Sequence, residues 1–265
     1  MNPSPLSRGR ARAADLLPRR RSRLERLRLR LPDRAATTLH VAGYRRDAYM
    51  PRVVILDRPL QLVRWCRQEE VSHAVVGGFF ARPEYAPLGY LRTDGQERPA
   101  VPFDPPWGEV RGCLQILDGE PRIARRDQLT ARGGDVLQAG PVLVADGRRV
   151  VEDGEDAEGF SAGSRQFDAD ITGGRYPRAA LAIAGERLLA VACDGRTDRD
   201  AGMTLPELAD SLLDLGATEA LNLDGGGSAS LVYRGQLRNR PREEHGADLL
   251  GGRPIVSAVV FAPRL

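Results

Sequence analysis

The clearest alternation of apolar and polar positions in the chain lies between residues 178 and 193. Two apolar runs, 178–184 and 187–193, are separated by Gly185-Glu186. A two-residue loop with glycine in its first position is typical of a tight β-hairpin. The pattern predicts that residue 184 pairs with residue 187, and it places Arg178 opposite Cys193.

A helix and another strand are predicted to follow this hairpin. Thr204-Leu-Pro-Glu207 has the form of a capping box with proline in the first turn, and apolar residues then recur at helical spacing up to Gly216. Residues 220–224 read as a short strand that ends in Asp224. Strand, helix and strand in this order predict a right-handed β-α-β crossover, which joins parallel strands.

The first half of the chain and the C-terminus contain further apolar runs. These predict strands at 52–56, 73–76, 112–117 and 253–261, a strand at 136–144 that is interrupted by Gly140-Pro141, and a helix at 60–70. Residues 83–108 are rich in proline, glycine and charge, which indicates an ordered irregular loop or lid. The predicted fold class is α/β, close to α+β, with a mixed β-sheet core and flanking helices.

Positive charge is concentrated at the N-terminus. Residues 1–30 hold ten arginines against Asp15 and Glu25, a local charge of +8, so the remaining residues carry about −5 of the total of +3. We therefore expect an Arg-rich, partly disordered extension over 1–35 and a single domain over 36–265. The alternative is that this extension contacts nucleic acid or anionic lipid, although no specific nucleic-acid partner is predicted.

Several classes of chemistry are excluded by the residues that the chain lacks. The chain contains no lysine, which removes a phosphate-loop lysine and a Schiff-base lysine. Its three cysteines are far apart, and its three histidines form no metal-binding motif. The sequence predicts no cofactor and no metal site, with a divalent cation left open. No leader or membrane segment is visible, so a cytoplasmic location is expected.

Polar side chains gather where the predicted crossover strands end. Both strands end in Asp-Gly, at Asp194-Gly195 and Asp224-Gly225, and ligands of parallel sheets bind beyond the carboxyl ends of the strands. The hairpin register adds Arg178 at the same edge. We therefore predict that Asp224, Asp194 and Arg178 converge and form the catalytic group.

The stretch from Asn222 to Ser228 allows more than one interpretation. Alternation places Asn222 and Asp224 on one face of the strand, directly before three consecutive glycines. The glycines indicate either a tight turn or backbone that a ligand can approach closely, including an anion-binding nest. Gly77-Gly78-Phe79-Phe80 similarly indicates either a pocket wall or a turn followed by core aromatic residues.

Paired carboxylates beside arginines suit hydrolysis at an anomeric or phosphoryl centre. One carboxylate holds a proton for the leaving group, while the other stabilises positive charge on the sugar or directs a water molecule. Arginine binds phosphate through two parallel hydrogen bonds. The alternative to a catalytic role is a structural one, in which Asp194 forms a turn and Arg178 forms an ion pair.

A series of motifs, in order over roughly residues 50–262, resembles the phosphodiester glycosidase domain family (NAGPA-like, the "uncovering enzyme" and exopolysaccharide-associated proteins). The motifs are Val76-Gly-Gly-Phe-Phe80, Ala139-Gly-Pro-Val-Leu-Val-Ala-Asp-Gly147, Tyr176-Pro-Arg-Ala-Ala180, Val191-Ala-Cys-Asp-Gly-Arg196, Gly202-Met-Thr-Leu-Pro-Glu-Leu-Ala209 and Ala220-Leu-Asn-Leu-Asp-Gly-Gly-Gly-Ser228, with Asn239 and Arg253 behind them.

The resemblance implies a hydrolase that cleaves a glycosidic bond in a sugar-1-phosphodiester, with a phosphorylated sugar or oligosaccharide as its substrate. The best-known member of the family removes N-acetylglucosamine from a sugar phosphodiester. Together, motifs and resemblance predict these substrate-binding residues: Asn222, Gly225, Gly226, Gly227, Ser228, Arg196, Gly78, Phe79, Phe80, Gly140, Asn239 and Arg253.

Two positions depart from the family pattern. Val76 stands where the family usually has asparagine, and Ala179 stands where it often has threonine. If both line the pocket, the loss of polar groups would alter the substrate or weaken the activity. The alternative function is therefore a non-catalytic binding protein for a phosphorylated sugar or polysaccharide. The sugar, the leaving group and the oligomeric state are not determined by these patterns.

Overall fold

The strands 179–184 and 187–193 are apolar on both faces because both faces are covered. In the computed structural model, which describes residues 21–129, 133–161 and 173–264, they lie in the middle of a seven-stranded sheet. From edge to edge its strands are β1 (Ser22–Arg30), β2 (Ala36–Arg45), β15 (Arg187–Cys193), β14 (Ala179–Ala184), β16 (Glu219–Asn222), β12 (Val142–Ala145) and β13 (Arg148–Arg149).

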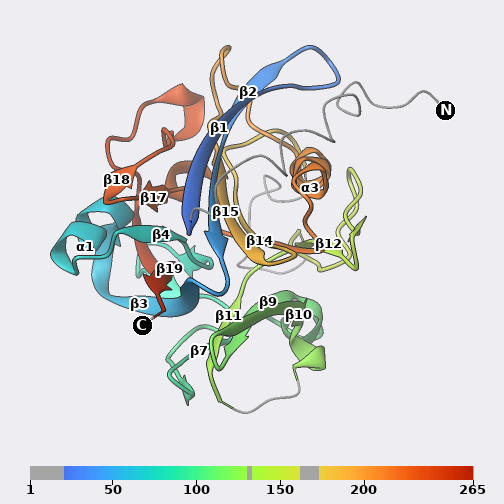
Figure 1. Ribbon diagram of the computed structural model, residues 1–265. Helices are drawn as coiled ribbons and strands as arrows, with labels where there is room; N and C mark the ends of the chain where they lie inside the picture. The colour runs from blue at the N-terminus through green and yellow to red at the C-terminus, as the bar shows by residue number, and fades with distance from the viewer. Residues whose placement is uncertain (1–20, 130–132, 162–172, 265) are drawn as a thin grey trace.

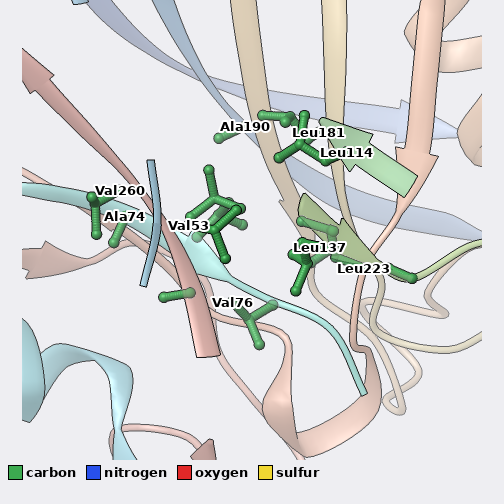
Figure 2. Packing of buried hydrophobic residues seen from close by; sticks show 14 of the residues in the cluster. Val53, Ala74, Val76, Leu114, Leu137, Leu181, Ala190, Leu223 and Val260 are labelled. Atoms are coloured by element: carbon green, nitrogen blue, oxygen red, sulfur yellow. The ribbon is translucent and has the colours of Figure 1, made fainter. Parts of the chain in front are cut away.

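A second sheet of five strands packs against one face of the first. Its order is β18 (Gln236–Leu237), β17 (Leu231–Tyr233), β4 (His73–Val76), β19 (Pro254–Pro263) and β3 (Tyr49–Gln61). Alternate residues of β14 and β15, such as Leu181 and Ala190, join the core between the sheets (Figure 2). This core also includes Val53, Ala74 and Val260 of the second sheet.

Helices cover the two outer faces. On one side, α3 (Leu205–Asp214) packs Leu208 and Leu212 against Ala180 and Val191, the residues of β14 and β15 that point away from the second sheet. On the other side, α1 (Leu62–Gln68) contributes its buried residues to the core of the second sheet. The result is a four-layer arrangement of helix, sheet, sheet and helix (Figure 1).

A smaller sheet closes the lower end of these layers in the view of Figure 1. Its strands, in order, are β10 (Glu120–Arg125), β9 (Gly112–Leu117), β11 (Asp135–Gln138), β7 (Leu91–Thr93) and β8 (Gln96–Glu97). The remaining elements among the described residues are the β5–β6 pair (Phe80–Ala81 and Ala86–Pro87), α2 (Trp107–Val110) and the 3₁₀ turns η2 (Arg126–Gln128), η3 (Gly226–Ser228) and η4 (Glu244–Gly246). Residues 83–108, expected as an irregular loop, thus contain β6, β7, β8 and part of α2.

The predicted hairpin and helix cap are present. Ala184 pairs with Arg187 and Ala179 with Ala192, and the Cys193 amide donates to the Arg178 carbonyl (2.9 Å). Thr204 and Glu207 form the reciprocal capping box at the start of α3. Both features depend only on residues close together in the chain.

The two strands of the predicted crossover are not adjacent in the sheet. β15 and β16 each pair antiparallel with β14, which lies between them. They run in the same direction but share no hydrogen bonds, and one intervening strand separates them by about 10 Å. All pairings between the described strands are antiparallel, so the expected mixed sheet is not seen either. Among the described residues 46% lie in strands and 13% in helices, so the fold is dominated by sheets.

The N-terminal extension was placed too far along the chain. Residues 22–30, expected within it, form β1, which pairs with β2 over its whole length. Leu27 and Leu29 alternate with arginines and pack beside the core under α3, so the strand has a clear apolar face despite its charge. Residues 1–20 lie outside the described residues. No helix in the described part of the chain is long and apolar enough to span a membrane.

Candidate active site

Several strands of the two large sheets end at a shared edge, and a pocket with a volume of about 150 Å³ opens there. Asp224 links the sheets, because it follows β16 in the first sheet while its amide donates to the carbonyl of Gly77, directly after β4 in the second (3.1 Å). The pocket is lined by Phe79, Phe80, Arg82, Tyr176, Arg178, Arg196, Asn222, Leu223, Asp224, Gly225, Gly226, Glu244 and Arg253.

The lining carries an excess of positive charge. It includes four arginines and two carboxylates, a formal balance of +2. The guanidinium carbons of Arg178 and Arg196 lie 5.4 and 5.5 Å from the centre of the Tyr176 ring. Such a cluster of planar cations is suited to bind an anion through pairs of hydrogen bonds.

Three of the four pocket arginines are held by protein carbonyls or by a carboxylate. Arg178 is 4% exposed and donates from Nε to the Met203 carbonyl (3.1 Å). Arg196 donates from Nη1 to the Arg242 carbonyl (2.9 Å) and has a left-handed backbone conformation with φ of 64°. A residue other than glycine in that region is uncommon, and such conformations are concentrated at functional sites.

Arg253 forms a two-bond ion pair with Glu243, at 2.9 and 2.5 Å. The hydrogen bond from Arg253 lowers the pKa of the Glu243 carboxyl below its usual value. Gly227 makes room for this pair, since a Cβ there would lie 2.8 Å from Glu243 Oε1. Gly227 therefore packs closely against the pair and does not itself line the pocket.

Asn222 lines the pocket and carries a buried, unpaired acceptor. Its side chain is 2% exposed, and Nδ2 donates to the carbonyl of Gly140 (2.8 Å). This bond sets the orientation of the amide, and Oδ1 is buried with no hydrogen-bond partner. A buried acceptor without a donor costs about 1–3 kcal/mol. A ligand with a hydroxyl or N–H group would remove that cost.

Gly225 and Gly226, which follow Asp224, allow the chain to turn closely against its neighbours. Gly225 allows close packing, because a Cβ there would lie 2.9 Å from the Pro177 carbonyl, and Gly226 has a φ of 57°. Their amides are already used: that of Gly225 donates to Asp224 Oδ1 and that of Gly226 to the Pro177 carbonyl. The anion nest suggested by three consecutive glycines is therefore not supported at these two amides.

Asp194 does not reach the pocket. Its side chain is 4% exposed, and Oδ2 contacts His40 Nε2 (3.1 Å) while Oδ1 accepts from the Arg240 amide (2.6 Å). The predicted convergence of Asp194 with Asp224 is therefore not seen, because β14 lies between their strands. Arg178 and Asp224 do share the pocket, as predicted.

Four other predicted residues also lie outside the lining: Gly78, Gly140, Ser228 and Asn239. Asn239 braces the chain beside β17, accepting from the Leu231 amide and donating to the Ala229 carbonyl. Ser228 is fully buried. The Gly140 carbonyl orients Asn222, and the Gly78 amide donates to Ser257 Oγ. Gly140 and Ser228 thus contact residues that line the pocket, through Asn222 and Gly225.

The two departures from the family pattern lie in the core. Val76 and Ala179 are both fully buried, and neither lines the pocket. Figure 2 shows Val76 near other apolar side chains of the core. The change in pocket polarity expected from these substitutions is therefore not seen.

Sequence reasoning did not single out Arg82, Tyr176, Leu223 or Glu244 as site residues. Tyr176 lies in the same motif as Arg178, two residues before it, and Arg82 lies two residues after Phe80. Glu244 had no comparable signal, because it lies in the loop after β18 and reaches the pocket only through the tertiary fold.

A larger hollow of about 620 Å³ lies elsewhere, beside β7 and α2. Its lining includes Tyr90, Phe103, Glu109, Arg126 and Gln138, and none of the predicted site residues. The candidate active site is therefore the smaller pocket, where the charged groups and the motif residues coincide.

The comparisons with known proteins identify the family of the chain. A family model for phosphodiester glycosidases matches residues 69–262, nearly three quarters of the chain and all of the segments that line the pocket. The chain belongs to the phosphodiester glycosidase family. No curated protein sequence matches it.

Solved structures share the fold at low sequence identity. One similar structure is the catalytic domain of zebrafish N-acetylglucosamine-1-phosphodiester α-N-acetylglucosaminidase, auto-inhibited by its pro-peptide. The TM-score is 0.69, with 18% sequence identity over 92% of this chain and 83% of that chain. A hypothetical protein from Synechocystis has a TM-score of 0.65 and 18% identity over 92% of this chain. This chain spans 62% of that protein. A putative exported protein from Burkholderia pseudomallei has a TM-score of 0.63 and 16% identity, covering 87% and 75% of the two chains.

Proposed function

We propose that this protein hydrolyses the glycosidic bond of a sugar-1-phosphodiester and that its pocket binds the phosphate through arginines. The observation that carries this proposal is the combination of four arginines with Asp224 and Glu244 in one pocket of a phosphodiester glycosidase-family chain. The arginines match a phosphodiester, and the carboxylates match an anomeric centre that becomes positively charged.

The leaving group explains why arginines outnumber acids. A departing phosphate monoester has a second pKa of about 6 and needs little protonation. The arginines would stabilise the negative charge that develops on it. Asp224 would then stabilise the positively charged sugar or direct the attacking water, with Glu244 as the second carboxylate. The Asn222 acceptor would orient a hydroxyl or N–H group of the sugar.

The alternative of a non-catalytic binding protein was prompted by Val76. Since Val76 lies in the core, that observation no longer favours the alternative. A cytoplasmic location and the contact of the N-terminal residues with nucleic acid or lipid stay predictions. A deletion that tests such contact should end at residue 20, because β1 begins at Ser22.

The proposal is tested by comparing a panel of glycosyl phosphodiesters with neutral nitrophenyl glycosides of the same sugars. We expect a preference for the diester of about a hundredfold or more in kcat/KM, reflecting charge-assisted contacts to phosphate. Arg196→Met should lower kcat/KM for the diester by about tenfold or more and leave the neutral glycoside almost unchanged. The exposed Arg148→Met serves as the matched control.

Two results would contradict the proposal. Equal rates on charged and neutral substrates would remove the role of the arginines. Tight calorimetric binding of the diesters without turnover by the wild-type protein would identify a binding protein instead.

A further inference from the structure

Asp194 connects three separate parts of the chain through its side chain. It follows β15, and its carboxylate reaches His40 on β2 and the amide of Arg240 after β18. A carboxylate can only accept hydrogen bonds, so His40 Nε2 carries the hydrogen in this contact. With both oxygens engaged and the side chain 4% exposed, Asp194 has no oxygen turned toward the pocket.

The backbone of Asp194 is held independently of its side chain. Its amide donates to the carbonyl of Thr38 (2.9 Å), and its carbonyl accepts from Thr37 Oγ1 (2.7 Å). The end of β15 would therefore remain attached to β2 without the carboxylate. The specific contribution of the carboxylate is the link to Arg240.

Arg240 begins the segment 240–248, here called the arginine-anchoring loop, which holds two cations of the pocket. Arg196 donates to the Arg242 carbonyl of this loop, and Arg253 is paired with Glu243 of the same loop. Arg242 donates back to the carbonyl of Gly195 (3.5 Å). Glu244, which lines the pocket, also belongs to the loop.

We propose that Asp194 is a positioning residue, which fixes the arginine-anchoring loop and so holds the guanidinium groups of Arg196 and Arg253 at the phosphate site. The assignment of these groups to phosphate rests on the function proposed above. The connection between Asp194 and the arginine-anchoring loop does not depend on the proposed function, because it follows from the described contacts alone. This role differs from the acid–base role expected from the Asp-Gly motif.

Replacement by asparagine and by alanine separates the two roles. Asparagine keeps the shape of the side chain, with Oδ1 accepting from the Arg240 amide and Nδ2 donating to the other tautomer of His40. Alanine removes both contacts. A positioning residue should therefore be rescued by Asp194→Asn, whereas an acid–base residue should not.

Beside turnover of the phosphodiester, two readouts of positioning apply to each variant: the affinity for inorganic phosphate by calorimetry, and amide hydrogen exchange of residues 240–248. For Asp194→Ala we expect phosphate affinity to fall about tenfold or more, which corresponds to one charge-assisted contact. Exchange in the loop should become about tenfold faster, while β14 and β16 keep their protection. Asp194→Asn should stay within about threefold of the wild type in both measurements.

Thr38→Val is the matched control. It removes a buried hydroxyl on the same strand as His40. The partners of this hydroxyl are Asp200 and Arg28, and neither belongs to the arginine-anchoring loop. Thermal stability should fall in this variant without a change in phosphate affinity or in exchange of residues 240–248.

Each result decides the inference. Loss of turnover in Asp194→Asn with unchanged phosphate affinity and unchanged exchange would identify Asp194 as an acid–base residue and overturn the positioning role. Unchanged loop exchange in Asp194→Ala would also overturn it. If the wild-type protein binds no phosphate and cleaves no phosphodiester, the proposed function fails, and the exchange comparison still decides whether Asp194 holds the loop.

Discussion

Replacing Asp224 with asparagine is expected to lower kcat for glycosyl phosphodiester hydrolysis about a thousandfold, within the range of carboxylate acid–base and electrostatic catalysis. Asp224 lies in the pocket between the two sheets, where its Oδ1 accepts from the Gly225 amide (2.9 Å). Asparagine can still accept that hydrogen bond. The substitution therefore removes the charge and preserves the local turn, and the fold should be retained.

The measurement is steady-state turnover of the best phosphodiester from the panel, with circular dichroism to verify the fold. The control is Asp146→Asn, which changes an exposed aspartate in another Asp-Gly turn, far from the pocket lining. Turnover of Asp224→Asn within about tenfold of the wild type would exclude Asp224 as a principal catalytic residue.

Replacing Arg111 with leucine is expected to lower the free energy of unfolding by about 3 kcal/mol, because two buried carbonyls lose their donor at a cost of about 1–3 kcal/mol each. Arg111 is fully buried, with its guanidinium carbon 4.1 Å from the ring centre of Phe103 and 4.2 Å from that of Phe160. It donates to the carbonyls of Glu158 (3.0 Å) and Gly159 (2.6 Å). Leucine would leave both carbonyls without this donor.

The buried surroundings of Arg111 influence its charge and that of its neighbour. Burial lowers the pKa of Arg111 to about 10 and raises the pKa of the Glu158 carboxyl to about 7. Glu158 is held by the amides of Gly112 (2.8 Å) and Val142 (2.6 Å). Phe160, in turn, packs at 5.7 Å against Phe79 of the pocket wall. Loss of Arg111 should therefore loosen the segment behind that wall.

Urea unfolding of Arg111→Leu, compared with the exposed Arg122→Leu on β10, measures this contribution. A loss below about 1 kcal/mol would mean that the cation between the rings contributes little to stability.

Local patterns predicted the elements that depend on neighbouring residues. The hairpin around Gly185 and the cap at Thr204 are present because their hydrogen bonds join residues a few positions apart. The charge of residues 22–30 predicts an extension, whereas the alternation of Leu27 and Leu29 with arginines is typical of a strand with one apolar face. Alternation was the better guide to structure there than charge.

Local sequence patterns predicted only those site residues that lie at the end of the same strand or of its hairpin neighbour. Asn222, Asp224 and Gly225 lie within four positions, and the register of the hairpin brought Arg178 near them. The role of Asp194 depended on strand order, which a local pattern does not contain: with β14 between β15 and β16, its carboxylate turns to His40 and Arg240. Glu244 and Arg111 likewise depend on distant segments.

The most direct test of the central claim is the position of an oxygen label after hydrolysis in H₂¹⁸O. A glycosidase directs water to the anomeric carbon, so the phosphate monoester should carry no ¹⁸O in its ³¹P spectrum or its mass. Phosphate oxygens do not exchange with water at neutral pH, so the phosphate keeps a permanent record of the bond that was cleaved. If the ¹⁸O label is found in the phosphate, water attacks phosphorus, and the protein is a phosphodiesterase rather than a glycosidase.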